Sequence, residues 1–237
     1  FFSNKGKLYR LRGYEIPEAG RTAKGTAIVN LLSLDAGEKI SAIIPIQSFE
    51  DGKYLLMATK NGLIKKTPLK EYDSSRKTGL LAINLKDDDE LIDVRLTDGE
   101  DNVVLVTSKG MCITFDEKDV RPVGRSAQGV LGIRLDDDDF VIGMESILAN
   151  NKNATLLAIT ENGFGKRTEV DEYRVQNRGG RGVITYKITP KTGNIVGIRM
   201  ASEDEDVMLI TNSGTIIRIK VKYVSILGRA TQGVTLM

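Results

Sequence analysis

Five short loops of this 237-residue chain begin with an arginine and end with a glycine. The arginines, at intervals of 49 to 55 residues, are Arg21, Arg76, Arg125, Arg178 and Arg229, and the closing glycines are Gly25, Gly79, Gly129, Gly182 and Gly233. A guanidinium group can bind phosphate through two hydrogen bonds, and glycine lets main-chain N–H groups approach the same oxygens. The alternative is a repeated structural corner whose arginine binds nearby carbonyl groups. The pattern therefore predicts phosphate contact, a repeated corner, or both.

Other kinds of site chemistry find little support in the composition. The chain has no histidine, which excludes histidine-based acid–base catalysis and removes the usual ligands of most zinc sites. Its single cysteine, Cys112, fits a reducing cytoplasm and is expected to be a small buried hydrophobe. Acidic runs at 87–90, 136–139 and 203–206 lack the ligand spacing of an EF-hand and are expected to be solvated turns that repel anions. We therefore expect no catalytic residue, metal or cofactor in this chain.

The arginine loops belong to a longer repeat that opens with a β-hairpin. The hairpin glycines are Gly6, Gly62, Gly110, Gly163 and Gly214, and threonine or serine stands three residues before each. We expect two-residue turns with positive φ at both positions. Each unit reads as four short strands with no amphipathic helix, which is typical of an all-β propeller.

The repeats lie approximately at 1–50, 51–99, 100–150, 151–201 and 202–237 and are expected to form a single domain. The chain already opens on the strand and turn of a repeat, and the fifth repeat stops within its third strand. We therefore expect a piece of a longer protein, with an incomplete sixth unit. No apolar run is long enough to span a bilayer.

Charge is distributed unevenly along each repeat. The five stretches from hairpin to loop glycine hold 25 of the 34 basic residues and 11 of the 32 acidic ones, a net charge of +14, against −12 elsewhere. In a radial array this segregation predicts a continuous basic belt around the rim. The alternative is that lysines on exposed edge strands only prevent aggregation.

The belt is predicted to bind duplex DNA, because stacking aromatic residues are too few for a single-strand binder. Thr114 replaces the basic residue that four repeats carry four positions after the hairpin glycine, so a weak point is expected there. The candidate DNA-binding residues are Lys7, Arg10, Arg12, Arg21, Lys24, Lys65, Lys66, Arg76, Lys77, Arg125, Lys166, Arg167, Arg178, Arg181, Arg218, Lys220, Lys222 and Arg229.

One loop carries a more specific pattern, Gln176-Asn177-Arg178-Gly179-Gly180-Arg181-Gly182. It resembles the "gyrase box" found in the A subunit of bacterial DNA gyrase, and it departs from that box at Asn177. The stretches 163–168, 124–129 and 27–32 are also similar to the C-terminal domain of the gyrase A protein, and the resemblance covers essentially the whole chain.

The resemblance implies a β-pinwheel, a propeller relative with four-stranded blades in which strands are exchanged between neighbours. It implies that the basic perimeter wraps DNA with positive handedness, as an accessory to an ATP-dependent type II topoisomerase that introduces negative supercoils. The implied partners are duplex DNA, the gyrase B protein and the remainder of the gyrase A protein, with no membrane. The implied location is the cytoplasm, in association with the bacterial nucleoid.

The resemblance also places the catalytic tyrosine, the metal site and the ATP site outside this chain. The principal box of the family is expected upstream of Phe1, so the segment 176–182 is expected to be a secondary copy. Two alternatives stay open, the related domain of topoisomerase IV and a propeller that serves as a protein-interaction scaffold.

Overall fold

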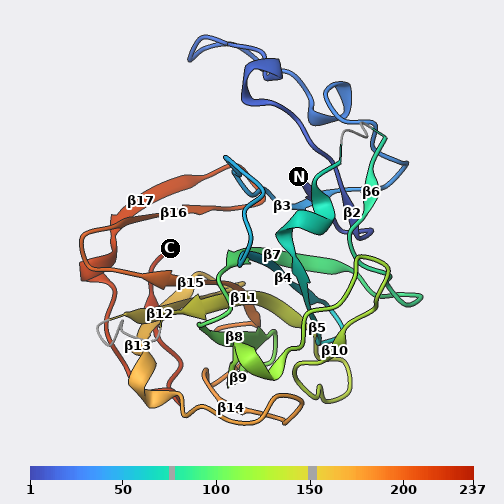
Figure 1. Ribbon diagram of the computed structural model, residues 1–237. Coiled ribbons are helices and arrows are strands. Elements are labelled where there is room, and N and C mark those ends of the chain that lie inside the picture. Colours follow the sequence, from blue (N-terminus) through green and yellow to red (C-terminus); the bar gives the residue numbers. More distant parts are fainter. Residues whose placement is uncertain (75–77, 149–153) are drawn as a thin grey trace.

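The structure is a computed structural model that describes residues 1–74, 78–148 and 154–237. These residues form an all-β fold of five antiparallel sheets arranged around a centre (Figure 1). No α-helix occurs within the described ranges. The described residues contain six short 3₁₀ turns, of which all but η2 follow a hairpin: η1 (Gly13–Glu15), η2 (Ile28–Asn30), η3 (Leu69–Tyr72), η4 (Glu117–Asp119), η5 (Val170–Glu172) and η6 (Val221–Tyr223).

Four of the sheets have four strands each, and their strands follow in order from the innermost outward. The first contains β3 (Ile40–Ala42), β1 (Phe2–Ser3), β2 (Lys7–Leu8) and β6 (Leu80–Leu81). The second contains β7 (Leu91–Thr97), β4 (Tyr54–Thr59), β5 (Leu63–Pro68) and β10 (Val130–Leu131). The third contains β11 (Val141–Ile147), β8 (Asn102–Thr107), β9 (Met111–Asp116) and β14 (Val183–Ile184). The fourth contains β15 (Ile195–Ala201), β12 (Thr155–Thr160), β13 (Phe164–Glu169) and β18 (Val234–Thr235).

Each outermost strand comes from the following repeat, so a blade does not coincide with a sequence repeat. Thus β10 of the third repeat pairs with β5 of the second, with Val130 opposite Ile64. The strand exchange implied by the family resemblance is therefore confirmed. The fifth sheet has two described strands, β16 (Asp206–Ile210) and β17 (Ile216–Lys220).

The hairpins form at the predicted glycines, but with a different turn geometry. Gly62 has φ 83°, whereas the only non-glycine residues with positive φ among those described are Asp88 and Asp138. The turns are therefore three-residue loops that end in a left-handed glycine, not two-residue turns. The preceding threonine stabilises this geometry, because Leu63 N donates a hydrogen bond of 3.1 Å to Thr59 Oγ1. Met111 N and Thr107 Oγ1 repeat the contact at 3.1 Å.

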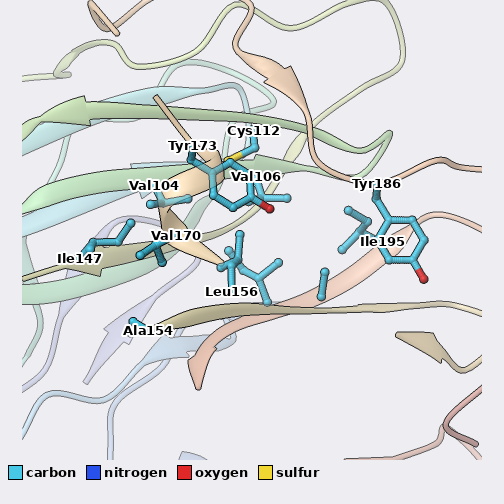
Figure 2. Close-up of a cluster of buried hydrophobic side chains, with 12 residues drawn as sticks. Val104, Val106, Cys112, Ile147, Ala154, Leu156, Val170, Tyr173, Tyr186 and Ile195 are labelled. Atoms are coloured by element: carbon cyan, nitrogen blue, oxygen red, sulfur yellow. The ribbon is translucent and has the colours of Figure 1, made fainter. Parts of the chain in front are cut away.

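The hydrophobic core lies between neighbouring blades. One cluster joins the third and fourth sheets through Val104, Leu156, Tyr173 and Ile195 (Figure 2). Cys112 lies in the same cluster and is fully buried, which confirms the role expected for it. Burial raises the pKa of its thiol to about 12, so the group stays protonated and unreactive near neutral pH.

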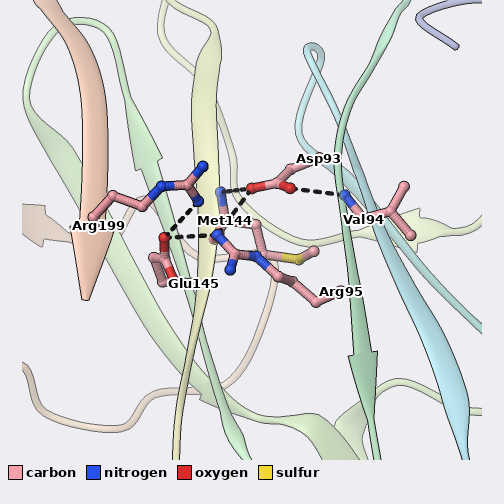
Figure 3. Close-up of polar contacts among 6 residues, drawn as sticks. All are labelled: Asp93, Val94, Arg95, Met144, Glu145 and Arg199. Carbon is pink, nitrogen blue, oxygen red and sulfur yellow. Dashed lines mark hydrogen bonds and ion pairs between the residues drawn. The ribbon is translucent and has the colours of Figure 1, made fainter. Parts of the chain in front are cut away.

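An ionic network joins the innermost strands of three blades (Figure 3). Glu145 Oε1 on β11 lies 2.6 Å from a guanidinium nitrogen of Arg95 on β7 and 3.1 Å from one of Arg199 on β15. Arg95 also donates to the main-chain oxygen of Met144 at 3.1 Å and lies 3.5 Å from Asp93. This network holds the inner ends of the blades in register.

Candidate nucleic-acid interface

The arginine loops of the third, fourth and fifth repeats lie where the chain crosses from one blade to the outer edge of the preceding blade. Each of these three loops leaves a 3₁₀ turn and enters the exchanged outer strand, as η5 leads through 174–182 into β14, whereas the first loop leads into η2 and β3. A main-chain N–H of the preceding exchanged segment donates to each of the three loops. The three described contacts are Asn84 N to Ala127 O, Arg134 N to Gly180 O and Lys187 N to Thr231 O, at 3.2, 2.8 and 3.0 Å. The loops therefore follow one another along the outer perimeter.

Two of the loop arginines act as structural ties, which supports the corner interpretation. A guanidinium nitrogen of Arg178 donates to Leu131 O at 3.0 Å, and its Nε donates to Asp119 O at 3.0 Å. In the next loop Arg229 donates to Ile184 O at 3.2 Å. The acceptors Leu131 and Ile184 lie on the outer strand of the preceding repeat, so each arginine fixes the crossing of its own loop. Arg125 is half-buried, and Arg76 with Lys77 lies outside the described residues.

Three closing glycines, Gly129, Gly182 and Gly233, are required by close packing against the backbone of the neighbouring blade. A Cβ atom on Gly182 would lie 2.2 Å from Cys112 O, and one on Gly129 would lie 2.6 Å from Ile64 O. Their φ values of 78° and 99° also favour glycine. These three glycines thus bring their loops against the second strand of the blade before, whereas a Cβ atom on Gly25 would meet nothing within 4 Å.

The box-like segment 176–182 docks on the third repeat through its main chain. Gln176 N donates to Thr114 O at 2.8 Å, and Gly179 N donates to Gly132 O at 2.6 Å. Asn177 and Arg181 are exposed, and Arg181 lies 3.6 Å from Asp136. The segment therefore presents the Arg181 cation to solvent, while Arg178 is held against the blade.

Two predicted belt lysines lie underneath the arginine loops. Lys65 Nζ donates to Ala82 O at 2.7 Å and to Arg125 O at 2.5 Å. Lys166 Nζ donates to Gly228 O and Arg229 O, both at 2.6 Å. Desolvation lowers the pKa of each lysine to about 8, and the arginine of the loop above adds to the shift. Glu172 opposes the shift at Lys166, and Glu71 opposes it at Lys65. The prediction that both lysines lie on the exposed belt is therefore wrong. Each ammonium group is buried and binds main-chain oxygens in the loop of the next repeat.

The basic position four residues after the hairpin glycine is also buried in two repeats. Lys66 Nζ donates to Glu117 O at 3.0 Å and lies 3.5 Å from its carboxylate. Arg167 Nε donates to Val224 O at 2.9 Å. Each cation ties its blade to the 3₁₀ turn of the next repeat, so neither stands on an exposed belt as expected. Thr114 occupies the same buried position, and the expected gap is therefore not a gap in the exposed surface.

The remaining candidates reach the surface to different degrees. Arg12, Arg21 and Lys24 are exposed in the segment between β2 and β3. Lys7 and Arg10 are half-buried and pair with Asp35 and Asp73 respectively. In the fifth repeat Arg218 and Lys220 are neighbours that share Asp206, and Lys222 is exposed beside Tyr223.

Two exposed arginines on this perimeter were not predicted. Arg121 and Arg174 both stand eleven residues after a hairpin glycine, directly after the 3₁₀ turn. Only two repeats have arginine at this position, so comparison of positions that most repeats share does not reveal it. These arginines could have been found from their position just before the loop.

Two of the acidic runs lie at hairpin turns, and the run 136–139 also reaches an arginine loop, because Asp136 lies 3.6 Å from Arg181. The run 203–206 lies at the other end of its hairpin, where Asp206 pairs with Lys220. Asp89 Oδ1 accepts a hydrogen bond of 2.9 Å from Asn61 N, and Asp139 Oδ1 accepts one of 3.0 Å from Lys109 N. These carboxylates cap the hairpin turns. Among the described residues no cluster of three or more acidic, histidine or cysteine side chains has the arrangement of a metal site.

Three open hollows of about 290, 540 and 650 Å³ lie along the described residues. A cavity of about 290 Å³ at the centre is lined by β3 and by Asp93, Arg95 and Arg199, and it adjoins the ionic network. Within the described ranges no helix has the length and apolar character needed to cross a membrane.

Comparison with known proteins covers nearly the whole chain. Residues 1–47, 53–98, 101–147, 154–202 and 205–237 match the family described as "DNA gyrase C-terminal domain, beta-propeller". The DNA gyrase A protein of Clostridium acetobutylicum is 55% identical over 237 residues, which are all of this chain and 28% of that relative. The DNA gyrase A protein of Salmonella typhimurium is 44% identical over 236 residues, covering 100% of this chain and 26% of the relative. The chain thus spans little more than a quarter of these relatives.

Solved structures agree with the sequence relatives. The C-terminal domain of DNA topoisomerase IV superposes with a TM-score of 0.91 at 33% identity, covering 100% of this chain and 73% of that one. A DNA gyrase A C-terminal domain gives 0.85 at 29% identity, covering 100% and 77%. These matches confirm the pinwheel fold and the resemblance on which it was expected. The chain belongs to the family of DNA gyrase C-terminal domains, which are parts of type II topoisomerases.

Proposed function

We propose that this domain binds duplex DNA along its loop-bearing perimeter, and bends and wraps it without strong sequence preference. The observation that supports the proposal is the order of the arginine loops of the third, fourth and fifth repeats along the outer edge, each bonded to the segment before it. Arg121, Arg174 and Arg181 are exposed in or beside these loops, and Arg21 and Lys24 are exposed in the first arginine loop. A row of cations on a curved surface suits a phosphate backbone, whose charges recur at short intervals.

In this proposal the domain is an accessory part of an ATP-dependent gyrase that introduces negative supercoils. The gyrase B protein, together with the remainder of the gyrase A protein, would supply the catalytic tyrosine, the metal site and the ATP site. The domain would present a second DNA segment for strand passage. The cytoplasmic, nucleoid-associated location belongs to the same proposal.

The same function in topoisomerase IV is a second candidate, because the domain of that enzyme superposes with a TM-score of 0.91. A topology assay measures how far the domain wraps DNA. Wrapping of relaxed circular DNA by this domain, followed by a type I topoisomerase, should leave a linking-number change that grows with protein concentration. A domain that only binds would leave the linking number unchanged.

Binding itself is tested by the affinity for a labelled duplex over a range of salt concentrations. Phosphate contacts predict that the logarithm of the association constant falls linearly with the logarithm of salt concentration. A protein-interaction scaffold would instead give feeble binding at low salt with no slope, and that result would reject the proposal.

A further inference from the structure

One peptide group in the last arginine loop is held between a cation and an anion of the protein itself. The carbonyl oxygen of Gly228 accepts a hydrogen bond of 2.6 Å from Lys166 Nζ. The N–H of the same peptide belongs to Arg229 and donates to Glu172 Oε2 at 3.1 Å. Carbonyl and N–H point in opposite directions across a trans peptide, so the cation lies inside the loop and the anion outside it.

Lys166 orients the following peptide group, Arg229 to Ala230, in the same way. Its ammonium group also binds Arg229 O at 2.6 Å and Thr231 Oγ1 at 3.1 Å. The N–H of Ala230, which belongs to that second peptide, has no hydrogen-bond acceptor among the described residues. Two successive N–H groups therefore face away from Lys166, which is the arrangement of a main-chain anion site.

Glu172 occupies this site as an anionic ligand would. Its Oε2 atom lies 3.8 Å from Arg229 Nε in addition to its contact with the main-chain N–H. The two side chains are only partly covered, with 39% of Glu172 and 33% of Arg229 exposed. The carboxylate can therefore leave without any rearrangement of the core, and the site opens to solvent when it does.

We propose that the turn from Gly228 to Ala230 is a phosphodiester-binding site whose ligand position is held by Glu172 in the free protein. A phosphate of duplex DNA takes the place of the carboxylate, binding the N–H groups and the Arg229 guanidinium. Lys166 is a positioning residue, because it fixes the carbonyls and does not touch the phosphate. This inference rests on the proposed DNA binding and assigns one site within it.

The loop of the third repeat is a similar loop to which no carboxylate of the described residues is hydrogen-bonded. It has the same Arg-x-x-Gln-Gly composition, and Lys65 binds Arg125 O as Lys166 binds Arg229 O. Glu71 takes the sequence position that corresponds to Glu172. No hydrogen bond joins it to the loop 124–129, all of whose residues are described. The Glu172 contact is therefore not a necessary consequence of this loop fold.

The test compares Glu172→Gln with Asp171→Asn, which removes the same charge from the neighbouring exposed residue of η5. Glu172→Gln should tighten binding of a labelled duplex roughly threefold to tenfold, and Asp171→Asn by less than about twofold. In an NMR titration with the same duplex, and separately with inorganic phosphate, the Arg229 amide should shift at lower ligand concentration in Glu172→Gln than in the wild type.

The outcomes separate this inference from the function on which it rests. Equal affinity gains in the two variants, or an Arg229 amide that does not respond, would overturn the gated site while leaving DNA binding intact. If neither the wild type nor either variant binds the duplex, the proposed function and the proposed site are both wrong. A response to inorganic phosphate but not to duplex would show an anion site that DNA does not reach, and would also overturn the inference.

Discussion

The ammonium group of Lys65 lies 2.5 Å from the main-chain oxygen of Arg125, a residue 60 positions further along the chain. Lys166 and Arg229 repeat this relationship at 2.6 Å across 63 positions. In both cases a buried lysine of one blade supports the arginine loop of the next repeat through hydrogen bonds. Some of the basic residues in the charged stretches therefore join blades, and only the exposed ones are available to a ligand.

The first prediction follows from the lowered pKa of Lys65 and Lys166, about 8 in the folded protein against 10.5 for the free side chain. Below pH 8 both groups are protonated in both states. Between pH 8 and pH 10 the unfolded chain binds more protons, so the free energy of unfolding should rise with pH. The rise should slow from about pH 9 and turn into a fall above pH 10, because burial raises the pKa of Cys112, Tyr72 and Tyr173 in the folded state.

Urea unfolding at several pH values checks this. The double variant Lys65→Met with Lys166→Met should lose most of the rise between pH 8 and pH 10. Lys70→Met with Lys118→Met, which alters two exposed lysines, should keep it. A rise that persists in the first double variant would show that these two lysines do not titrate in that range.

The second prediction concerns the exposed cations. Arg21→Ala and Arg181→Ala should each weaken duplex binding uniformly across sequences and reduce the salt slope by about 1, as loss of one phosphate contact requires. Lys39→Ala is the control, because Lys39 is exposed directly before the innermost strand β3, whereas Arg181 stands just before the outermost strand β14. The slope of this control should not change. A drop for Lys39 equal to that for Arg181 would mean that DNA shows no preference for the outer perimeter.

The hairpins and the loops could be predicted because their signals are local. A glycine in a left-handed turn and a threonine three residues earlier lie within one hairpin, and Leu63 N bonding to Thr59 shows the reason for the pairing. The strand exchange was expected only from the family resemblance, because no local pattern tells Val130 to pair with Ile64 rather than within its own repeat.

The buried lysines could not be predicted from the residues alone. Lysine is seldom fully buried, so the sequence around Lys65 favours a surface residue. Its acceptors, Ala82 O and Arg125 O, lie 17 and 60 positions away, and main-chain carbonyls leave no mark in the sequence. The contact of Glu172 escapes prediction for the same reason, since its partner is a main-chain N–H.

The third prediction concerns the buried pair Lys66 and Glu117. Lys66→Met should lower the free energy of unfolding by about 3–5 kcal/mol, because it leaves a carboxylate buried without its cation. Thr97 Oγ1, which donates to Glu117 at 2.5 Å, cannot replace the lost charge. Adding Glu117→Gln should restore most of the loss. Chemical denaturation measures all three proteins, and a double variant no more stable than Lys66→Met would show that the packing of the lysine stem matters more than its charge.

The last prediction concerns the ionic network at the inner strands. Glu145→Gln should lower the free energy of unfolding by about 1–3 kcal/mol, because it removes the carboxylate that Arg95 and Arg199 share. Burial raises the pKa of Glu145 in spite of the two arginines, which indicates that the carboxylate is costly to bury and depends on them. Arg199→Gln should cost less than about 1 kcal/mol, since that side chain is 65% exposed and Arg95 keeps its bonds to Glu145 and Met144. Urea unfolding at neutral pH measures both variants. A loss for Arg199→Gln as large as that for Glu145→Gln would show that the more exposed Arg199, rather than Arg95, holds the blades together.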